Sequence, residues 1–229
     1  MNGIYEYLLH ETNIDINDTK PDEIIVVKTL NDKLAITRLD NGFTVIKVNE
    51  SSIPLMNQYI ETYRSDLFSE NAVSFITKHF RLNSTNNPCE YIYGITDVKE
   101  LLPNTIFDST ARINLATLKT MNPNKFTKYP FKSPNEKLIY FGTYVNREVV
   151  SLTSGYLGDF KAVELTGETL LEYRNRGYAK SNTLAITKYL LANGYEVFTT
   201  NGIHNSASIQ TVESLGFRRY GCRLAFFAE

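Results

Sequence analysis

The segment from Glu172 to Phe198 limits most strongly what this chain can fold into. It reads EYRNRGYAKSNTLAITKYLLANGYEVF, a loop with two arginines and a glycine that leads without a break into amphipathic sequence. Leu184 and Leu191 belong to the apolar stripes of a helix that we expect from about residue 178 to 193. Gly194 follows, and a glycine there is typical of the left-handed residue that ends a helix. The run YEVFTT then predicts a strand, so this part of the chain has an α/β character.

The sequence on either side predicts further strands and one more helix. KLIYFGTY and EVVSLTSGY are strand-like runs joined by VNR, which predicts an antiparallel hairpin. FKAVELTGETL is another strand, and Gly167 within it is typical of a bulge or of a place where another backbone or a ligand comes close. Asn205 or Ser206 caps a last helix that Gly216 ends, and FRRYGCRLAFFAE predicts a final strand. The predicted order after residue 134 is β-β-β-α-β-α-β.

The first hundred residues predict a separate mixture of strands and helix. DEIIVVKTL, KLAITRL and FTVIKV are short β-branched runs, and Asn41-Gly42 between the last two favours a tight hairpin turn. SSIPLMNQYIETYRSDLF predicts a helix, because Pro54 suits a first helical turn. LNSTNNP is polar and rich in turn-forming residues, as in a boundary or an exposed loop. We expect a mixed α/β region over residues 1–105, which could serve the substrate side, and a second domain over residues 106–229.

The composition excludes several classes of function. The net charge of −1 gives no broad basic field for nucleic acid, so any anion site must be local. The two cysteines are too few for a disulfide framework, and neither they nor the three scattered histidines have metal-ligand spacing. The first residues do not read as a signal peptide, and no apolar run approaches the length of a membrane helix. We expect a cytoplasmic protein without a metal, a nucleic-acid partner or a membrane partner.

The loop before the predicted helix has the properties of a phosphate site. The start of a helix leaves backbone N–H groups unpaired and carries partial positive charge, and a phosphate satisfies both. Gly177 has no side chain and Ala179 has a small one, so an anion can approach the amides of residues 175–180 closely. Arg174, Arg176 and Lys180 add local positive charge. The alternative is that Gly177 only turns the chain and that the arginines are solvated.

The residues from about Ala162 to Gly221 resemble the GCN5-related N-acetyltransferase (GNAT) family. The Arg/Gln-x-x-Gly-x-Gly/Ala loop of that family is matched by Arg174, Gly177 and Ala179, and its downstream Asn-x-x-Ser by Asn205 and Ser208. The helix-ending LGF at residues 215–217 is a third match. The resemblance implies the acyl-CoA N-acyltransferase fold, an α/β fold with a mixed, mostly antiparallel sheet flanked by helices, preceded here by the additional mixed N-terminal region.

The resemblance also implies acetyl-CoA as the acetyl donor. Its pantetheine arm would pair with the strand before the loop, where that strand and the strand after the helix splay apart. A main-chain amide of that strand would polarise the thioester carbonyl. Asn205 could contact the arm, cap the helix, or do both. The implied cofactor-binding residues are Gly167, Glu168, Thr169, Arg174, Asn175, Arg176, Gly177, Tyr178, Ala179, Lys180, Asn205 and Ser208.

Catalysis in this family is direct transfer of acetyl to an amine, which needs a base. Glu164 and Glu168 are the catalytic candidates, since residues four apart on an unbulged strand share a face; each could equally be a solvent-facing glutamate. Many family members protonate the leaving thiolate with a tyrosine seven residues beyond the asparagine, but Val212 stands there. Tyr220, Tyr178 or water could substitute.

Two functions therefore stay open at this point. The first is an acyltransferase that acetylates an amine of a small molecule or a protein. The second, motivated by Val212, is a non-catalytic module that binds CoA or another phosphate ligand as a sensor or for interaction. The acceptor substrate and the oligomeric state, a homodimer included, cannot be derived from the sequence, because a fold does not select its substrate.

Overall fold

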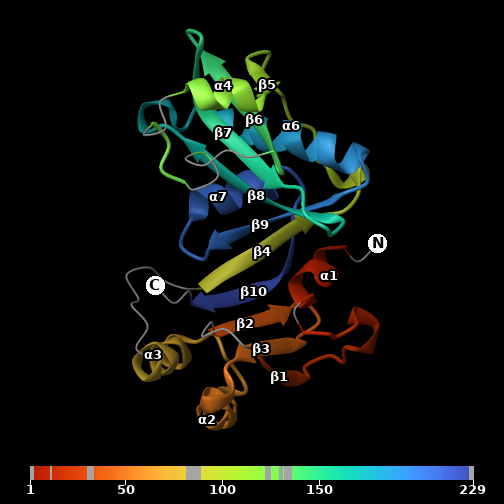
Figure 1. Cartoon of the computed structure of the whole chain (residues 1–229), viewed down its shortest axis with the longest axis vertical. Coiled ribbons are helices and arrows are strands. Elements are labelled where there is room, and N and C mark those ends of the chain that lie inside the picture. The colour runs from red at the N-terminus through yellow and green to blue at the C-terminus, as the bar shows by residue number, and fades with distance from the viewer. Residues whose placement is uncertain are drawn as a thin grey trace. The chain divides into compact units, whose positions relative to one another are not determined.

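The computed structural model describes residues 3–10, 12–29, 34–80, 89–121, 125–128, 131 and 136–226, with side chains up to residue 224 in the last strand (Figure 1). Contacts divide the chain into two compact units. The first unit comprises the residues up to Tyr7, Tyr93–Thr200 and Ser206–Arg218, and the second comprises Leu8–Ile92, Asn201–Asn205 and the residues from Arg219 onward. The domain boundary near residue 105 stays a prediction, since compactness does not show which part folds on its own.

The sheet of the first unit has the strand order β4-β9-β8-β7-β6-β5. The pairs β5–β6, β6–β7 and β7–β8 are antiparallel, whereas β8 and β9 are parallel. The mixed, mostly antiparallel sheet predicted from the sequence is thereby confirmed. The strands are β4 (Cys89–Ile95, which enters this unit at Tyr93), β5 (Thr110–Arg112), β6 (Leu138–Val145), β7 (Glu148–Tyr156), β8 (Ala162–Thr169) and β9 (Glu196–Gly202).

Helices cover both faces of this sheet. α6 (Tyr178–Ala192) packs on β5, β6, β7 and β8 (Figure 1). The opposite face carries a cluster with α4 (Leu115–Thr120), and this cluster buries Ile113, Leu118, Phe126, Phe131, Tyr140, Val149 and Leu152. α7 (Ser206–Glu213) follows β9 and contacts α6. The remaining elements are the short α1 (Gly3–Leu9), which begins in this unit, and the 3₁₀ turns η3 (Val98–Glu100) and η5 (Leu171–Tyr173).

Local sequence explains where these elements begin and end. Asn146 and Arg147, both at positive φ, turn the chain between β6 and β7, so the hairpin predicted around VNR is confirmed. Gly194 at φ 78° follows α6, as expected of a glycine after a helix. The ladder between β7 and β8 runs without a shift through Gly167, and the irregularity lies at Thr143/Tyr144 instead. Gly167 is therefore not a bulge, which leaves close approach as its sequence-based interpretation.

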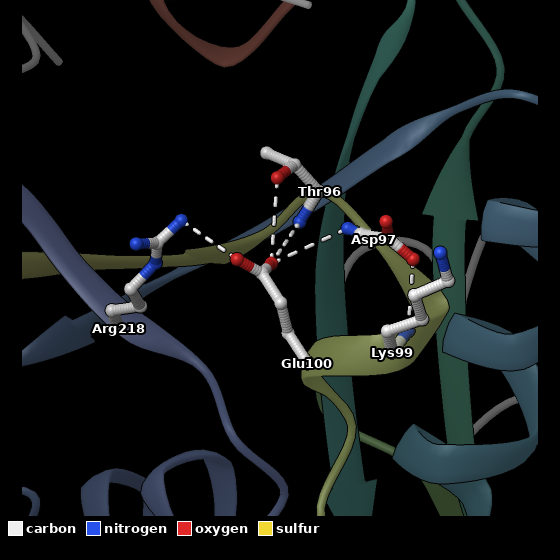
Figure 2. Close-up of polar contacts among 5 residues, drawn as sticks. All are labelled: Thr96, Asp97, Lys99, Glu100 and Arg218. Carbon is white, nitrogen blue, oxygen red and sulfur yellow. Dashed lines mark hydrogen bonds and ion pairs between the residues drawn. The ribbon is translucent and has the colours of Figure 1, made fainter.

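The connection after β4 is fixed by one carboxylate (Figure 2). The carboxylate of Glu100 accepts hydrogen bonds from the main-chain N–H groups of Thr96, at 3.1 Å, and Asp97, at 3.3 Å, and forms an ion pair with Arg218 at 2.7 Å. The main chain of this connection lies close to the end of α7, because a Cβ at Gly216 would come within 2.2 Å of the Glu100 carbonyl oxygen. The segment is thus held by side-chain and main-chain contacts together.

The second unit contains β1 (Ile24–Lys28), β2 (Leu34–Leu39), β3 (Thr44–Val48), most of β10 (Arg218–Phe226) and the beginning of β4. The strand order is β1-β3-β2-β10, with β2 antiparallel to both β3 and β10. Gly42 at φ 87° makes the predicted hairpin turn. The helices are α2 (Ile53–Tyr63), with Pro54 in its first turn, and α3 (Glu70–His79); the 3₁₀ turns are η1 (Ile16–Asp18) and η2 (Glu50–Ser52). The predicted turn-rich loop LNSTNNP lies outside the described residues.

The core of the second unit is apolar and lies under its two longer helices. It buries Leu34, Ile36, Ile46, Val48, Met56, Tyr59, Leu67, Ala72, Ile76, Cys89 and Leu224. Cys89 is thus a small core residue, and burial raises the pKa of its thiol to about 11, so the thiol stays protonated at neutral pH.

Candidate functional site

The loop between β8 and α6 presents an uncapped helix start. Asn175 and Gly177 adopt left-handed conformations, at φ 59° and 79°, and Gly177 occupies the N-cap position without a side-chain hydrogen bond to the helix. The first helical bond runs from Ser181 N–H to the Gly177 carbonyl, at 3.0 Å. The N–H groups of residues 178–180 therefore have no acceptor within the helix. They and the helix dipole form a site suited to an anion.

The two arginines of the loop bind main-chain carbonyls of the loop itself. Arg174 Nε donates to the Thr169 carbonyl oxygen at 3.1 Å, and Arg176 donates to the Glu172 carbonyl oxygen at 3.2 Å. The Arg176 guanidinium also lies over the Tyr173 ring, 5.4 Å from its centroid. Both arginines are exposed. They therefore hold the shape of the loop and keep positive charge beside the helix start.

Phe107 lies against Gly177 from another part of the chain. A Cβ added at Gly177 would come within 3.2 Å of Phe107 Cζ, which is tighter than an ordinary contact. The Phe107 ring also meets Tyr178 edge to face, with centroids 5.8 Å apart. Glycine is therefore favoured at position 177 for two reasons, its positive φ and the aromatic ring beside it.

The ladder between β8 and β9 ends before either strand does. The paired residues run from Ala162/Glu196 to Glu164/Phe198, although β8 continues to Thr169 and β9 to Gly202. On its other side β8 stays paired with β7 from Leu165 to Thr169. The last part of β8 therefore has one edge without a strand partner in the described ladders. That edge begins after Glu164 and ends at the loop before α6.

Two hydrogen bonds show which main-chain groups point to this edge. Leu170 N–H donates to the Val150 carbonyl, so even-numbered residues of β8 turn their main chain toward β7. Glu196 N–H donates to the Lys161 carbonyl, so odd-numbered residues point toward β9. The N–H groups of Leu165, Gly167 and Thr169 therefore lie along the unpaired edge. Glu168, which the sequence grouped with Gly167 and Thr169, directs its own N–H to β7.

The two candidate glutamates share a face of β8 but have different surroundings. Because the ladder with β7 has no shift from Leu165 to Thr169, Glu164 and Glu168 lie on one face, as expected. The carboxylate of Glu164, at the point where the β8–β9 ladder ends, accepts a hydrogen bond from Thr200 Oγ1 at 2.7 Å. Thr200 belongs to β9, so this bond fixes the carboxylate between the two strands.

Glu168 is occupied by a different segment of the chain. Its carboxylate accepts bonds from Thr127 N–H, at 2.9 Å, Thr127 Oγ1, at 2.8 Å, and Lys128 N–H, at 2.9 Å. Partial burial alone would raise the pKa of Glu168, but these bonds and the Lys128 charge outweigh it and lower the pKa. A carboxylate so held is a poor proton acceptor, and its position suits an anchor for the segment around residue 127.

The other predicted residues lie at or near the ends of elements. Tyr178, Ala179 and Lys180 form the first turn of α6 and are half-buried. Asn205 is exposed directly before α7, and Ser208 is half-buried within it. Their part in ligand binding stays a prediction, as does that of the whole predicted set. Val212 is buried and apolar, so it supplies no proton.

Two kinds of site are not found among the described residues. No group of three or more His, Cys, Asp or Glu side chains there could hold a metal ion. No helix in the described part of the chain is long and apolar enough to cross a membrane.

The fold and the half-paired strands place the chain among proteins with the acyl-CoA N-acyltransferase fold. Its C-terminal part resembles the GNAT family: the model of the family described as "FR47-like protein" matches residues 147–224, less than half of the chain. This range contains β8, the loop, α6, β9 and α7. The resemblance found in the sequence is thereby confirmed for this part of the chain.

Solved structures support the same fold. A protein assigned to the GNAT acetyltransferases from Novosphingobium aromaticivorans aligns with a TM-score of 0.50 and 17% identity, over 60% of this chain and 62% of its own. This chain thus spans less than two thirds of that one. An acetyltransferase of the GNAT family from Colwellia psychrerythraea aligns with a TM-score of 0.51 and 13% identity, over 85% of this chain and 81% of its own. No curated protein matches the sequence. At these identities the likeness shows the fold.

Proposed function

We propose that the protein transfers an acetyl group from acetyl-CoA to an amine of a small molecule or a protein. The observation that carries the proposal is that the unpaired edge of β8 leads directly into the uncapped start of α6. A row of main-chain hydrogen-bonding groups thus ends at a site for an anion. A ligand with an amide-containing arm joined to a diphosphate has both features, and CoA is such a ligand.

The residues of both parts fit this ligand. The amides of Asn175 to Lys180 would hold the diphosphate, because Gly177 exposes them and, as the N-cap residue, makes no side-chain hydrogen bond to the helix. The outward main-chain groups of Leu165, Gly167 and Thr169 would pair with the amides of the arm as a neighbouring strand does. The Thr169 carbonyl is already bound by Arg174, which leaves the Thr169 N–H as the donor nearest the loop.

The base in this proposal is Glu164. When bound, acetyl-CoA supplies an acetyl group activated as a thioester. The Glu164 carboxylate, oriented by Thr200, removes a proton from the amine directly or through a water molecule, and the amine nitrogen can then form the C–N bond as the C–S bond breaks. Glu168 is left out of this role, although the sequence made it an equal candidate, because three donors already occupy its carboxylate.

Main-chain donors complete the chemistry. The outward N–H groups of Leu165 and Gly167 can stabilise the negative charge that develops on the carbonyl oxygen. The leaving thiolate takes a proton from a tyrosine such as Tyr178 or Tyr220, or from water, since Val212 has none to give.

A binding module without catalysis is the second candidate, and buried Val212 at the usual tyrosine position favours it. Titration calorimetry with acetyl-CoA, followed by a thiol-release assay over a panel of amines, separates the two. Absence of binding at high micromolar acetyl-CoA would contradict the enzyme and a module specific for CoA, and would leave only a module for another phosphate ligand. Tight binding without amine-dependent thiol release would favour the module, and steady release with any amine would establish the enzyme.

A further inference from the structure

A continuous series of buried and partly buried hydrogen bonds crosses the first unit beneath the start of α6. Four of its side chains are at most 1% exposed: Thr143, Ser151, Ser181 and Asn182. Most side-chain hydrogen bonds in proteins go to the backbone or to water, whereas these bonds join side chains of β5, β6, β7, β8 and α6 to one another. On one side of Asn182 the links are Phe107 N to Ser181 Oγ (2.9 Å), Ser181 Oγ to Thr110 Oγ1 (2.8 Å), Thr110 Oγ1 to Thr143 Oγ1 (3.1 Å) and Thr143 Oγ1 to Asn182 Oδ1 (2.7 Å). On the other side they are Asn182 Nδ2 to Ser151 Oγ (3.0 Å) and Ser151 Oγ to Thr169 Oγ1 (2.7 Å).

The direction of each bond follows from the number of hydrogens available. A hydroxyl has one hydrogen to donate, and the Thr143 hydroxyl donates it to Asn182 Oδ1, which can only accept. Thr110 must therefore donate to Thr143, and Ser181, which accepts from Phe107 N–H, must donate to Thr110. The bonds on this side all point toward Asn182.

On the other side the bonds point away from Asn182. Its amide Nδ2 donates to Ser151 Oγ, so the hydrogen of the fully buried Ser151 hydroxyl has Thr169 Oγ1 as its acceptor at 2.7 Å. Leaving that hydrogen unpaired in the interior would cost about 1–3 kcal/mol, which fixes this direction. Asn182 is thus the one member that connects two runs of hydroxyl groups through a rigid amide.

The two ends of this series lie at the two halves of the proposed cofactor site. Phe107 begins it, and the Phe107 ring packs against Gly177 at the helix start. Thr169 ends it, and Thr169 closes the unpaired edge of β8 just before the loop. Asn182 itself is in the second turn of α6.

We propose that Asn182, through Ser151 and Thr169, is a positioning residue that holds the anion-binding amides of α6 at a fixed distance from the unpaired edge of β8. This inference rests on the proposed function. Asn182 then couples the helix start to the unpaired edge of β8. A ligand that spans both parts must match the distance between them, whereas a ligand that contacts only the helix start need not. Apolar side chains of similar size would fill this space equally well, so packing alone does not account for a chain of satisfied polar groups.

The test compares a ligand that spans the site with one that covers half of it. Calorimetry measures the binding of CoA and of ADP, which carries the diphosphate without the pantetheine arm, to the wild type, Asn182→Leu and Ser151→Ala. We expect the dissociation constant for CoA to rise about tenfold in both variants and that for ADP to change less than twofold. Ser151→Ala removes the hydrogen bond between Asn182 Nδ2 and Ser151 Oγ with a smaller change in side-chain shape, so this variant still tests the coupling if Asn182→Leu does not fold.

Thr187→Val is the matched control, because Thr187 is a fully buried threonine of the same helix whose hydroxyl has no hydrogen-bond partner among the residues that the structure describes. It should leave both dissociation constants unchanged. If Ser151→Ala weakens the binding of CoA and ADP equally, the series of hydrogen bonds supports only the loop before α6. If the binding of both ligands is unchanged, the series has no role in binding. Either result overturns the coupling. A wild type that binds neither ligand would instead refute the proposed function on which the coupling depends.

Discussion

Gly177 offers the sharpest test of the anion site. Gly177→Glu places a carboxylate at the N-cap of α6, where the proposed diphosphate would lie. It also forces a residue with a Cβ into φ 79°, which costs about 1–2 kcal/mol of folding free energy. The new Cβ would lie 3.2 Å from Phe107 Cζ, so the ring must shift by a few tenths of an ångström. The fold should survive, since a domain has about 5–15 kcal/mol of stability.

The effect on binding should be much larger than the effect on folding. Two like charges about 4 Å apart repel each other by about 1 kcal/mol in water and by about 4 kcal/mol near a protein surface. A diphosphate presents at least two such charges, so the loss of binding free energy should be at least about 2 kcal/mol, which is about 30-fold in the dissociation constant. Calorimetry with CoA measures the binding, and thermal unfolding measures the fold.

Gly194→Glu supplies the control at the other end of the same helix. Gly194 has nearly the same φ, 78°, and a Cβ there would meet no atom within 4 Å. This variant therefore carries the same backbone penalty and the same added charge away from the proposed ligand. If Gly177→Glu and Gly194→Glu bind CoA equally well, the helix start does not hold the diphosphate and the reasoning fails.

Three further predictions concern single residues. Glu164→Gln should lower the amine-dependent thiol-release rate by about 10²–10⁴-fold with CoA affinity retained, as removal of a general base requires; an unchanged rate would exclude Glu164. Glu168→Gln should destabilise the fold above pH 4.5, where the wild-type carboxylate is ionised, and the stability difference between wild type and variant should vanish as the pH falls through the lowered pKa of Glu168. Acid unfolding followed by circular dichroism measures this difference, and a difference that does not change with pH would contradict the prediction. Gly216→Ala should cost about 2–4 kcal/mol in urea unfolding, because φ is 97° and the new Cβ would lie 2.2 Å from the Glu100 carbonyl oxygen; a loss below about 1 kcal/mol would contradict that contact.

The features that the sequence predicted correctly depend on neighbouring residues. The helix from Tyr178 to Ala192 follows from apolar spacing and from Gly194, and the β6–β7 hairpin from two strand-like runs around Asn146 and Arg147. The shared face of Glu164 and Glu168 follows from the two-residue period of a strand. Each of these properties is decided within a few positions along the chain, so the sequence states it directly.

The features that the sequence did not reveal depend on distant partners. The carboxylate of Glu168 has different surroundings from that of Glu164 because Thr127 and Lys128 donate hydrogen bonds to it, and the sequence near Glu168 does not indicate these donors. The pairing of β10 with β2 joins opposite ends of the chain, and the residue pattern at 221–226 does not predict pairing with residues 34–39. Such pairings are chosen by tertiary packing, which local pattern does not encode.

Asn182 stands between these two cases. An asparagine followed by Leu184 and Ile186 in a helix that buries one face is a visible anomaly, since asparagine forms helices poorly and its amide needs partners wherever it is buried. The sequence therefore shows that something must satisfy the amide, but Thr143 and Ser151 lie on strands far away in the chain. A polar residue at a core-facing helix position one turn beyond a glycine-containing loop is thus informative in the sequence alone. It marks a place where the fold holds a helix start by hydrogen bonds, whose geometry is narrower than that of apolar packing.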